Sequence, residues 1–143
     1  MQKYILTDTC FWIGLIDDTD QHHTESSTLS ELISDSNIIL PYPCLYETVN
    51  TKLTRNKKRL ALFEKLINKE NVTLISDSKY RKMALDKVFE RNNKYDDYSH
   101  SLVDAVLREM IKDVDIQIDY LISFNEKDFI DVCVKRNIQI LRD

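Results

Sequence analysis

Five short apolar runs alternate with longer stretches of helical periodicity, and this alternation restricts the chain to one class of fold. The runs cover residues 4–7, 37–40, 72–75, 120–123 and 138–141. Most are continuously apolar, which is typical of strands that are covered on both faces, as in parallel sheets. Strands that alternate with helices predict an α/β domain with helices on both faces of the sheet.

The stretches between the runs repeat apolar residues at close to the helical spacing. We expect helices over residues 25–34, 58–68, 79–91, 99–112 and 129–135. Pro43 suits the first turn of a further helix that carries Glu47. The polar residues 91–98 are predicted to form a loop. With 143 residues, of which 43% are hydrophobic, the chain is expected to form one domain over residues 1–143.

Several classes of protein are excluded or disfavoured by composition. Gly14 is the only glycine, so a glycine-rich phosphate loop of the Walker or dinucleotide type is excluded. No apolar run approaches the roughly 20 residues of a membrane span, and the N-terminus lacks the pattern of a secretion signal. The three cysteines, Cys10, Cys44 and Cys133, have no close spacing and indicate reduced thiols. We therefore expect a cytoplasmic protein.

The segment ILTDTCFWI places one carboxylate, Asp8, inside an apolar run. An ionised Asp that is buried without a partner costs several kcal/mol or more, so such a group is normally paired, hydrogen-bonded or bound to a metal. Asp8 could simply end a buried strand and cap the helix that follows. The alternative is a site at the tip of the strand.

Other polar side chains fall at comparable places, because sites in open α/β sheets form at the carboxyl ends of strands. Asn125 and Asp128 follow the fourth apolar run, and Glu47 lies on the helix after the second. Asp104 interrupts the apolar helix segment SLVDAVL. On a helix that starts at residue 99, the spacing would bring Asp104 onto one face with Ser101, and would place Asp97 in the same column.

Each acid also has a structural interpretation. Glu47 could lie on an exposed helix face, Asp104 could pair with Arg108, and Asp128 could cap the helix over residues 129–135. Together they favour a shared site. Two bare carboxylates about 4 Å apart repel by roughly 4 kcal/mol at an effective dielectric of 20. A cluster of three or four becomes tolerable with a divalent cation among them, and such oxygen ligands suit Mg²⁺ or Mn²⁺.

The motifs resemble those of the PIN-domain ribonucleases, especially the VapC-like toxins of bacterial toxin–antitoxin pairs. The resemblance covers nearly the whole chain. A strand that ends in Asp and Thr before an apolar helix is matched by ILTDTCFWIGLID, and the acid after the second strand by Glu47. The Asp of a small and apolar helix is matched by Asp104. The turn after the fourth strand is matched by Ser123, Asn125, Asp128 and Phe129.

The resemblance implies a three-layer α/β/α fold with a central parallel five-stranded sheet in the order 3-2-1-4-5. It implies hydrolysis of RNA phosphodiester bonds with one or two Mg²⁺ or Mn²⁺ ions held by Asp8, Glu47 and Asp104. Asn125 and Asp128 would orient a ligand or water, and Thr9, Ser101 and Ser123 would support the carboxylates. It also implies an antitoxin partner and a homodimer. Asn125 stands where many relatives have Asp, and Asp97 is a candidate to compensate.

The net charge of −4 argues weakly against a protein coated in nucleic acid, yet one basic segment, TKLTRNKKRL, could contact RNA phosphates. Its basic residues are Lys52, Arg55, Lys57, Lys58 and Arg59. A solvated helix face is the alternative interpretation of this segment.

Two other functions compete with the ribonuclease. A phosphatase with an aspartyl nucleophile usually needs a second Asp two residues after the first, and Cys10 occupies that position. A PIN-fold binding or regulatory module without catalysis is the alternative from another class. The retained acids Asp8, Glu47 and Asp104 argue against it.

Overall fold

The computed structural model of the protein describes residues 2–97 and 99–143. Its strands form one parallel five-stranded sheet in the order β3-β2-β1-β4-β5, as predicted. The strands are β1 (Tyr4–Thr7), β2 (Asn37–Pro41), β3 (Val72–Ile75), β4 (Tyr120–Ile122) and β5 (Gln139–Ile140). The continuously apolar segments thus occupy the centre of the sheet, where Ile5, Leu6 and Leu121 are at most 1% exposed.

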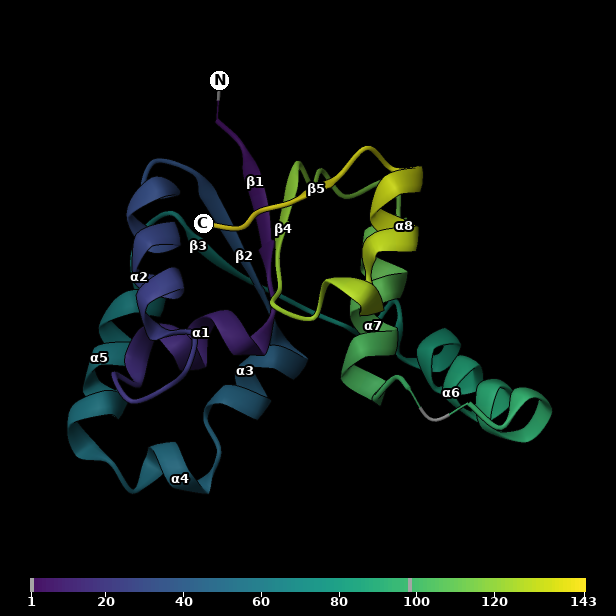
Figure 1. The fold of residues 1–143 in the computed structure, drawn as a ribbon, viewed down its shortest axis with the longest axis horizontal. Coiled ribbons are helices and arrows are strands. Elements are labelled where there is room, and N and C mark those ends of the chain that lie inside the picture. The colour runs from purple at the N-terminus through teal and green to yellow at the C-terminus, as the bar shows by residue number, and fades with distance from the viewer. Residues whose placement is uncertain (1, 98) are drawn as a thin grey trace.

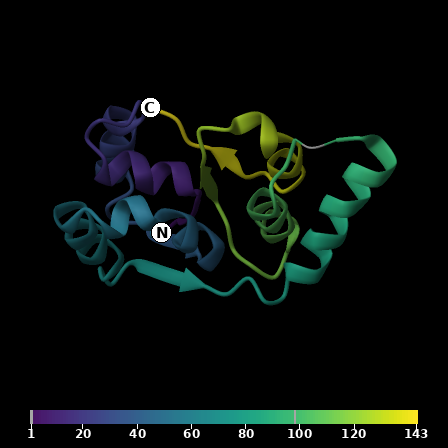
Figure 2. The same ribbon diagram turned by 90° about the horizontal axis from the view of Figure 1, so that it is seen from below.

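Helices cover both faces of the sheet, so the fold is the predicted three-layer α/β/α arrangement (Figures 1 and 2). One layer contains α1 (Thr9–Ile16), α2 (His23–Leu32) and α5 (Lys57–Ile67), with α3 (Tyr42–Thr48) and the short α4 (Thr51–Thr54) near its lower end. The other contains α7 (Leu102–Lys112) and α8 (Ile130–Lys135). Helix α6 (Arg81–Tyr95) lies outside α7, and a 3-10 turn, η1 (Glu126–Asp128), precedes α8. None of the described helices is long and apolar enough to cross a membrane.

Two expectations about the segment before α7 were wrong. Helix α6 continues through Tyr95, so residues 91–95 are helical and not part of a loop; Asp96 ends the helix with a left-handed φ of 51°. Tyr98, the last residue of the expected loop, lies outside the described residues. Helix α7 begins at Leu102 and not at residue 99, because Ser101 caps it. Asp97 therefore does not share a helix face with Ser101 and Asp104.

The register of β1 with its neighbours determines where the site forms. Thr7 lies opposite Ile122 of β4, and the backbone N–H of Asp8 donates to the carbonyl of Ile122 at 3.0 Å. The chain after β4 thus leaves the sheet beside Asp8. On the other side of β1, strand β2 leads directly into α3, which carries Glu47.

Candidate active site

Asp8 stands at the carboxyl end of the central strand and is 5% exposed. Its Oδ1 accepts a hydrogen bond from the backbone N–H of Thr9 at 2.8 Å, and its Oδ2 accepts one from Ser123 Oγ at 2.9 Å. The thiols of Cys10 and Cys44 add weaker contacts, at 3.7 Å and 4.0 Å. Asp8 is therefore the N-cap of α1, as the first interpretation held, and it is fixed in place by donors from several segments.

The pKa of Asp8 is raised to about 6, and burial is the main cause. The hydrogen bonds from Ser123 and Thr9 offset part of this shift, whereas the carboxylates of Asp104 and Glu47 add to it. A helix cap alone would not bring two further acids into electrostatic reach. The fold thus gathers Asp8, Glu47 and Asp104 from β1, α3 and α7 around one edge of the sheet.

Glu47 and Asp104 are each held by a neighbouring hydroxyl residue. Glu47 is exposed on α3, and its Oε1 accepts a hydrogen bond from Thr9 Oγ1. Asp104 forms a capping box with Ser101: the Asp104 carboxylate accepts from the Ser101 N–H at 3.2 Å, and Ser101 Oγ accepts from the Asp104 N–H at 3.1 Å. Thr9 and Ser101 are thus the hydroxyl residues in contact with these two acids, and their supporting roles stay a prediction.

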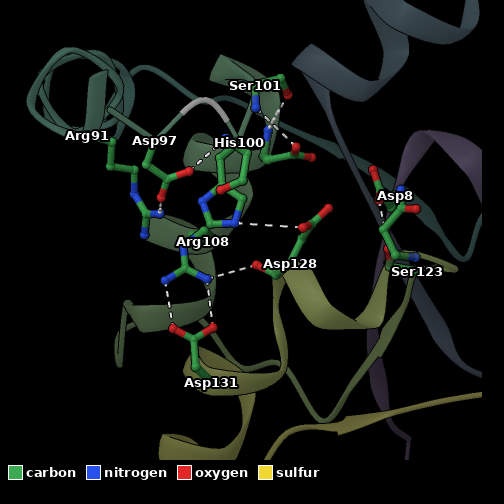
Figure 3. Close-up of polar contacts among 12 residues, drawn as sticks. Asp8, Arg91, Asp97, His100, Ser101, Arg108, Ser123, Asp128 and Asp131 are labelled. Carbon is green, nitrogen blue, oxygen red and sulfur yellow. Dashed lines mark hydrogen bonds and ion pairs between the residues drawn. The ribbon is translucent and has the colours of Figure 1, made fainter. Parts of the chain in front are cut away.

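The segment after β4 supports Asp8 from the other side. Ser123 is fully buried; its hydroxyl donates to Asp8 and accepts from the N–H of Asn125 at 3.1 Å. The side chain of Asn125 is exposed at the rim. Asp128 follows in η1, and its carboxylate faces His100 with 3.8 Å between Oδ1 and Nε2 (Figure 3). Asp128 does not cap α8, whose N-cap is Phe129, so that interpretation was wrong.

Asp97 is directed toward α6. Its carboxylate accepts from Arg91 Nη1 at 3.0 Å and from the N–H of Ser99 at 2.9 Å, and these contacts hold its pKa below the usual value. The Ser99 contact is the larger cause. Asp97 therefore interacts with a cation and a turn, and these contacts give no support to the expectation that it compensates for Asn125.

The chemistry of the acidic donors fits a hard divalent cation, because three carboxylates supply oxygen ligands and the charges of Asp104 and Glu47 add to the rise that burial causes in the pKa of Asp8. Within residues 2–97 and 99–143, however, no three His, Cys, Asp or Glu side chains are arranged to hold a metal ion. Glu47 is turned to Thr9 and Asp104 to Ser101. Binding a cation would require these two carboxylates to leave, or to share, those partners.

Arg108 pairs with Asp131 and not with Asp104, so the structural interpretation of Asp104 as its partner was wrong. Two guanidinium nitrogens of Arg108 donate to the Asp131 carboxylate at 2.7 and 2.8 Å, and one also donates to the carbonyl of Asp128 at 2.8 Å (Figure 3). Arg108 is only 8% exposed. It therefore ties α7 to η1 and α8 and fixes the backbone that carries Asp128.

Replacing Arg108 by Met should lower the free energy of unfolding by about 2 kcal/mol, because the buried guanidinium loses its bidentate pair with the 55% exposed Asp131 and its bond to the Asp128 carbonyl. Met keeps most of the apolar length. Urea unfolding measures the change. Arg142→Met is the matched control: Arg142 pairs with Glu25 and Glu126 but its side chain is 41% exposed, so its loss should cost less than about 1 kcal/mol. Equal losses for the two variants would contradict a tying role for Arg108.

In the structure, two residues of the basic segment TKLTRNKKRL lie close to acidic side chains. Arg59 pairs with Asp17 at 3.0 Å and with Asp18 at 3.2 Å, and Lys52 lies 3.9 Å from Asp17. Its three other cationic side chains, which are exposed, are those of Arg55, Lys57 and Lys58. The last three are therefore better candidates for RNA contact than Lys52 and Arg59.

Sequence reasoning missed three side chains near the site. Cys10 and Cys44 contact Asp8, and His100 faces Asp128. The apolar pattern around the two cysteines indicates burial, which is complete for Cys44 and partial for Cys10, but it does not indicate that they meet the same carboxylate. All three cysteines are free thiols, as predicted.

Comparisons with known proteins identify the fold. No protein-family model matches the chain, and no curated protein matches its sequence. Among solved structures, VapC20 of Mycobacterium tuberculosis, a toxin that cleaves the sarcin–ricin loop, matches with a TM-score of 0.69 and 17% identity, over 97% of this chain and 99% of that chain. VapBC2 of Rickettsia felis, bound to a DNA fragment from its promoter, matches with a TM-score of 0.63 and 13% identity, over 98% and 99%. The protein therefore has the PIN fold of the VapC toxins over nearly its whole length.

Proposed function

We propose that this protein is a metal-dependent endoribonuclease and the toxin of a toxin–antitoxin pair. The observation that carries the proposal is the environment of Asp8, which is buried at the tip of the central strand and has its pKa raised to about 6, in part by Asp104 and Glu47. A fold needs no such convergence of acids for its stability. A carboxylate with a perturbed pKa at the carboxyl edge of a parallel sheet is typical of a functional site.

Asp8, Glu47 and Asp104 would hold Mg²⁺ or Mn²⁺ at this edge. The bound ion would lower the pKa of a water molecule and stabilise the charge that develops on the phosphate. Ser123 and the N–H of Thr9 keep the Asp8 carboxylate in one orientation, while Thr9 Oγ1 and Ser101 restrain Glu47 and Asp104. Asn125 and Asp128, at the rim of the same edge, would orient substrate or water.

Structural neighbours support the choice of substrate and partner. One neighbour is a toxin that cleaves the sarcin–ricin loop, and the other is VapBC2 bound to promoter DNA. We infer an RNA substrate and an antitoxin that restrains the activity. A homodimer stays a prediction; exposed apolar side chains that could enter such an interface include Met83, Phe89, Ile130 and Val134. The cytoplasmic location also stays a prediction from the reduced cysteines.

Mapping RNA 5′ ends in cells after induction of the protein tests the proposal most directly. New ends at defined positions are expected for the wild type and not for Asp104→Asn. A binding or regulatory module without catalysis predicts equal RNA profiles for the two proteins. Purified protein with Mg²⁺ or Mn²⁺ then distinguishes direct cleavage from an indirect response.

Reversing the charges of Arg55, Lys57 and Lys58 together to Glu should weaken RNA binding at low salt by at least tenfold. The slope of log affinity against log salt should fall by about 2, since each phosphate contact on single strands contributes about 0.7. Sequence preference should change little, because phosphate contacts carry no base information. Fluorescence anisotropy at several salt concentrations measures both quantities.

The matched control reverses three exposed lysines at the amino edge of the sheet, namely Lys3, Lys69 and Lys135. It changes the net charge by the same amount, at a place remote from Asp8. If both triple variants reduce the slope equally, the effect comes from net charge, and the solvated-face interpretation of the basic segment is correct.

A further inference from the structure

His100 lies directly before the cap of α7, and its side chain is 9% exposed. Its Nε2 faces Asp128 Oδ1 at 3.8 Å. Its Nδ1 is buried and has no hydrogen-bond partner among residues 2–97 and 99–143. A proton on Nδ1 would leave a buried donor unpaired and turn a lone pair toward a carboxylate. The neutral ring therefore favours the tautomer with its proton on Nε2.

The surroundings of His100 favour this neutral ring. Burial is the main cause that lowers its pKa, and Arg91 and Arg108 lower it further, whereas Asp128 and Asp104 act in the opposite direction. The net shift is downward, so the imidazole is uncharged at pH 7. A neutral ring has one N–H to donate, and Nε2 directs it toward Asp128.

The neighbouring Arg108 contacts the backbone of Asp128, and its carboxylate contacts are with Asp131. Arg108 donates to the backbone carbonyl of Asp128 and to the carboxylate of Asp131. The backbone of η1 is thereby fixed, and the orientation of the Asp128 side chain is left to another group. Figure 3 shows Asp128 between His100 and the Asp8–Ser123 pair.

We propose that His100 is a positioning residue of the nuclease site, which holds one oxygen of Asp128 through Nε2–H so that the other oxygen faces the Asp8 edge. This role rests on the proposed ribonuclease function. The 3.8 Å separation is longer than a hydrogen bond, and contacts of this kind shorten when substrate binds. The contact joins the start of α7, which carries Asp104, to the turn after β4, which leads from Ser123.

Two nearly isosteric substitutions of His100 distinguish the roles of its two ring nitrogens. The amide nitrogen of His100→Gln reaches the position of Nε2, whereas that of His100→Asn reaches the position of Nδ1. His100→Leu keeps a similar volume and removes both nitrogens. We expect kcat on a fluorogenic RNA to fall about 10- to 100-fold for Leu and Asn and only about threefold for Gln, with little change in KM. Equal losses for Gln and Asn would overturn the proposal.

A double-mutant cycle with Asp128→Asn tests whether His100 acts through Asp128. In the Asp128→Asn background, His100→Leu should lower kcat no further. A full additional loss would assign His100 to general packing and overturn the positioning role. Melting temperatures of all variants, measured in parallel, show whether each protein is folded at the assay temperature.

A measurement without RNA separates this inference from the proposed function. The ¹⁵N chemical shifts of the ring in the metal-free wild type should show the Nε2–H tautomer at pH 7. An active wild type with the Nδ1–H tautomer would overturn the role of His100 alone. A wild type that cleaves no RNA with either metal would remove the proposed function, and this role with it, whatever the tautomer.

Discussion

Asp8→Asn should reduce the rate of RNA cleavage by at least about a hundredfold, with the protein still folded. Asn has nearly the same shape and caps a helix about as well as Asp, so α1 should persist. What is lost is the charge at the point where three acids converge. Removing one preorganised electrostatic group from an active site typically costs 10²–10³ in rate. Initial rates on a fluorogenic RNA, in Mg²⁺ and in Mn²⁺, measure the effect.

Asp35→Asn is the matched control for this experiment. Asp35 is exposed in the turn before β2, at the amino edge of the sheet, so the same chemical change is made far from the site. Its cleavage rate should equal that of the wild type. Asp104→Asn should behave like Asp8→Asn. If a folded Asp8→Asn protein cuts RNA as fast as Asp35→Asn, the carboxylate cluster is not the active site.

The first three strands could be predicted from the sequence because their runs are mostly apolar. The predicted bounds of β1 and β3 are those of the structure, and β2 differs only by Pro41 at its end. Alternation of strands and helices gave the class of fold, whereas the strand order depended on the resemblance, because apolar periodicity contains no information on which strands are neighbours.

The errors in the predicted helix bounds occur in the polar segment between α6 and α7. The end of α6 was predicted to be a loop because it is polar, yet residues 91–95 contain neither Gly nor Pro to end a helix. The start of α7 was placed too early, although Ser101 and Asp104 have the spacing of a capping box. That error also generated the expected column of Asp97, Ser101 and Asp104.

The arrangement of the candidate site was predictable in part. Acids that interrupt or follow apolar runs identified Asp8, Glu47 and Asp104, which the structure brings within electrostatic reach. The side-chain partners were not predictable, because they depend on packing between distant segments. Ser123 is 115 positions from Asp8 and Cys44 is 36 positions away. His100 lies in a polar segment without periodicity, so only the structure shows that it faces Asp128.

Asp8→Asn should also make the metal-free protein more stable at neutral pH, in contrast to its effect on activity. The folded protein raises the Asp8 pKa from 3.8 to about 6, which corresponds to a destabilisation of about 3 kcal/mol once the group is ionised. Asn removes this penalty but rearranges the hydrogen bond with Ser123, at a cost of about 1 kcal/mol. In EDTA at pH 7 the variant should therefore melt about 4–8 °C above the wild type.

The difference should depend on pH in a definite direction. Because the folded state binds the Asp8 proton more tightly than the unfolded state, the wild type loses its penalty as the pH falls from about 6 to about 4. The two melting temperatures should therefore converge near pH 4. Asp35→Asn should follow the wild type throughout, since Asp35 is exposed.

Divalent metal should reduce the difference in melting temperature between Asp8→Asn and the wild type. At a Mg²⁺ or Mn²⁺ concentration of 100 times the dissociation constant, the wild type gains about 2.7 kcal/mol from binding, which the variant largely lacks. The gap should close or reverse. A helix cap without a metal role predicts a different response to metal. Burial, the main cause of the raised pKa of Asp8, would still make Asp8→Asn more stable in EDTA, but metal would leave the difference unchanged. Melting curves of wild type, Asp8→Asn and Asp35→Asn in these buffers distinguish the two without any measurement of RNA cleavage.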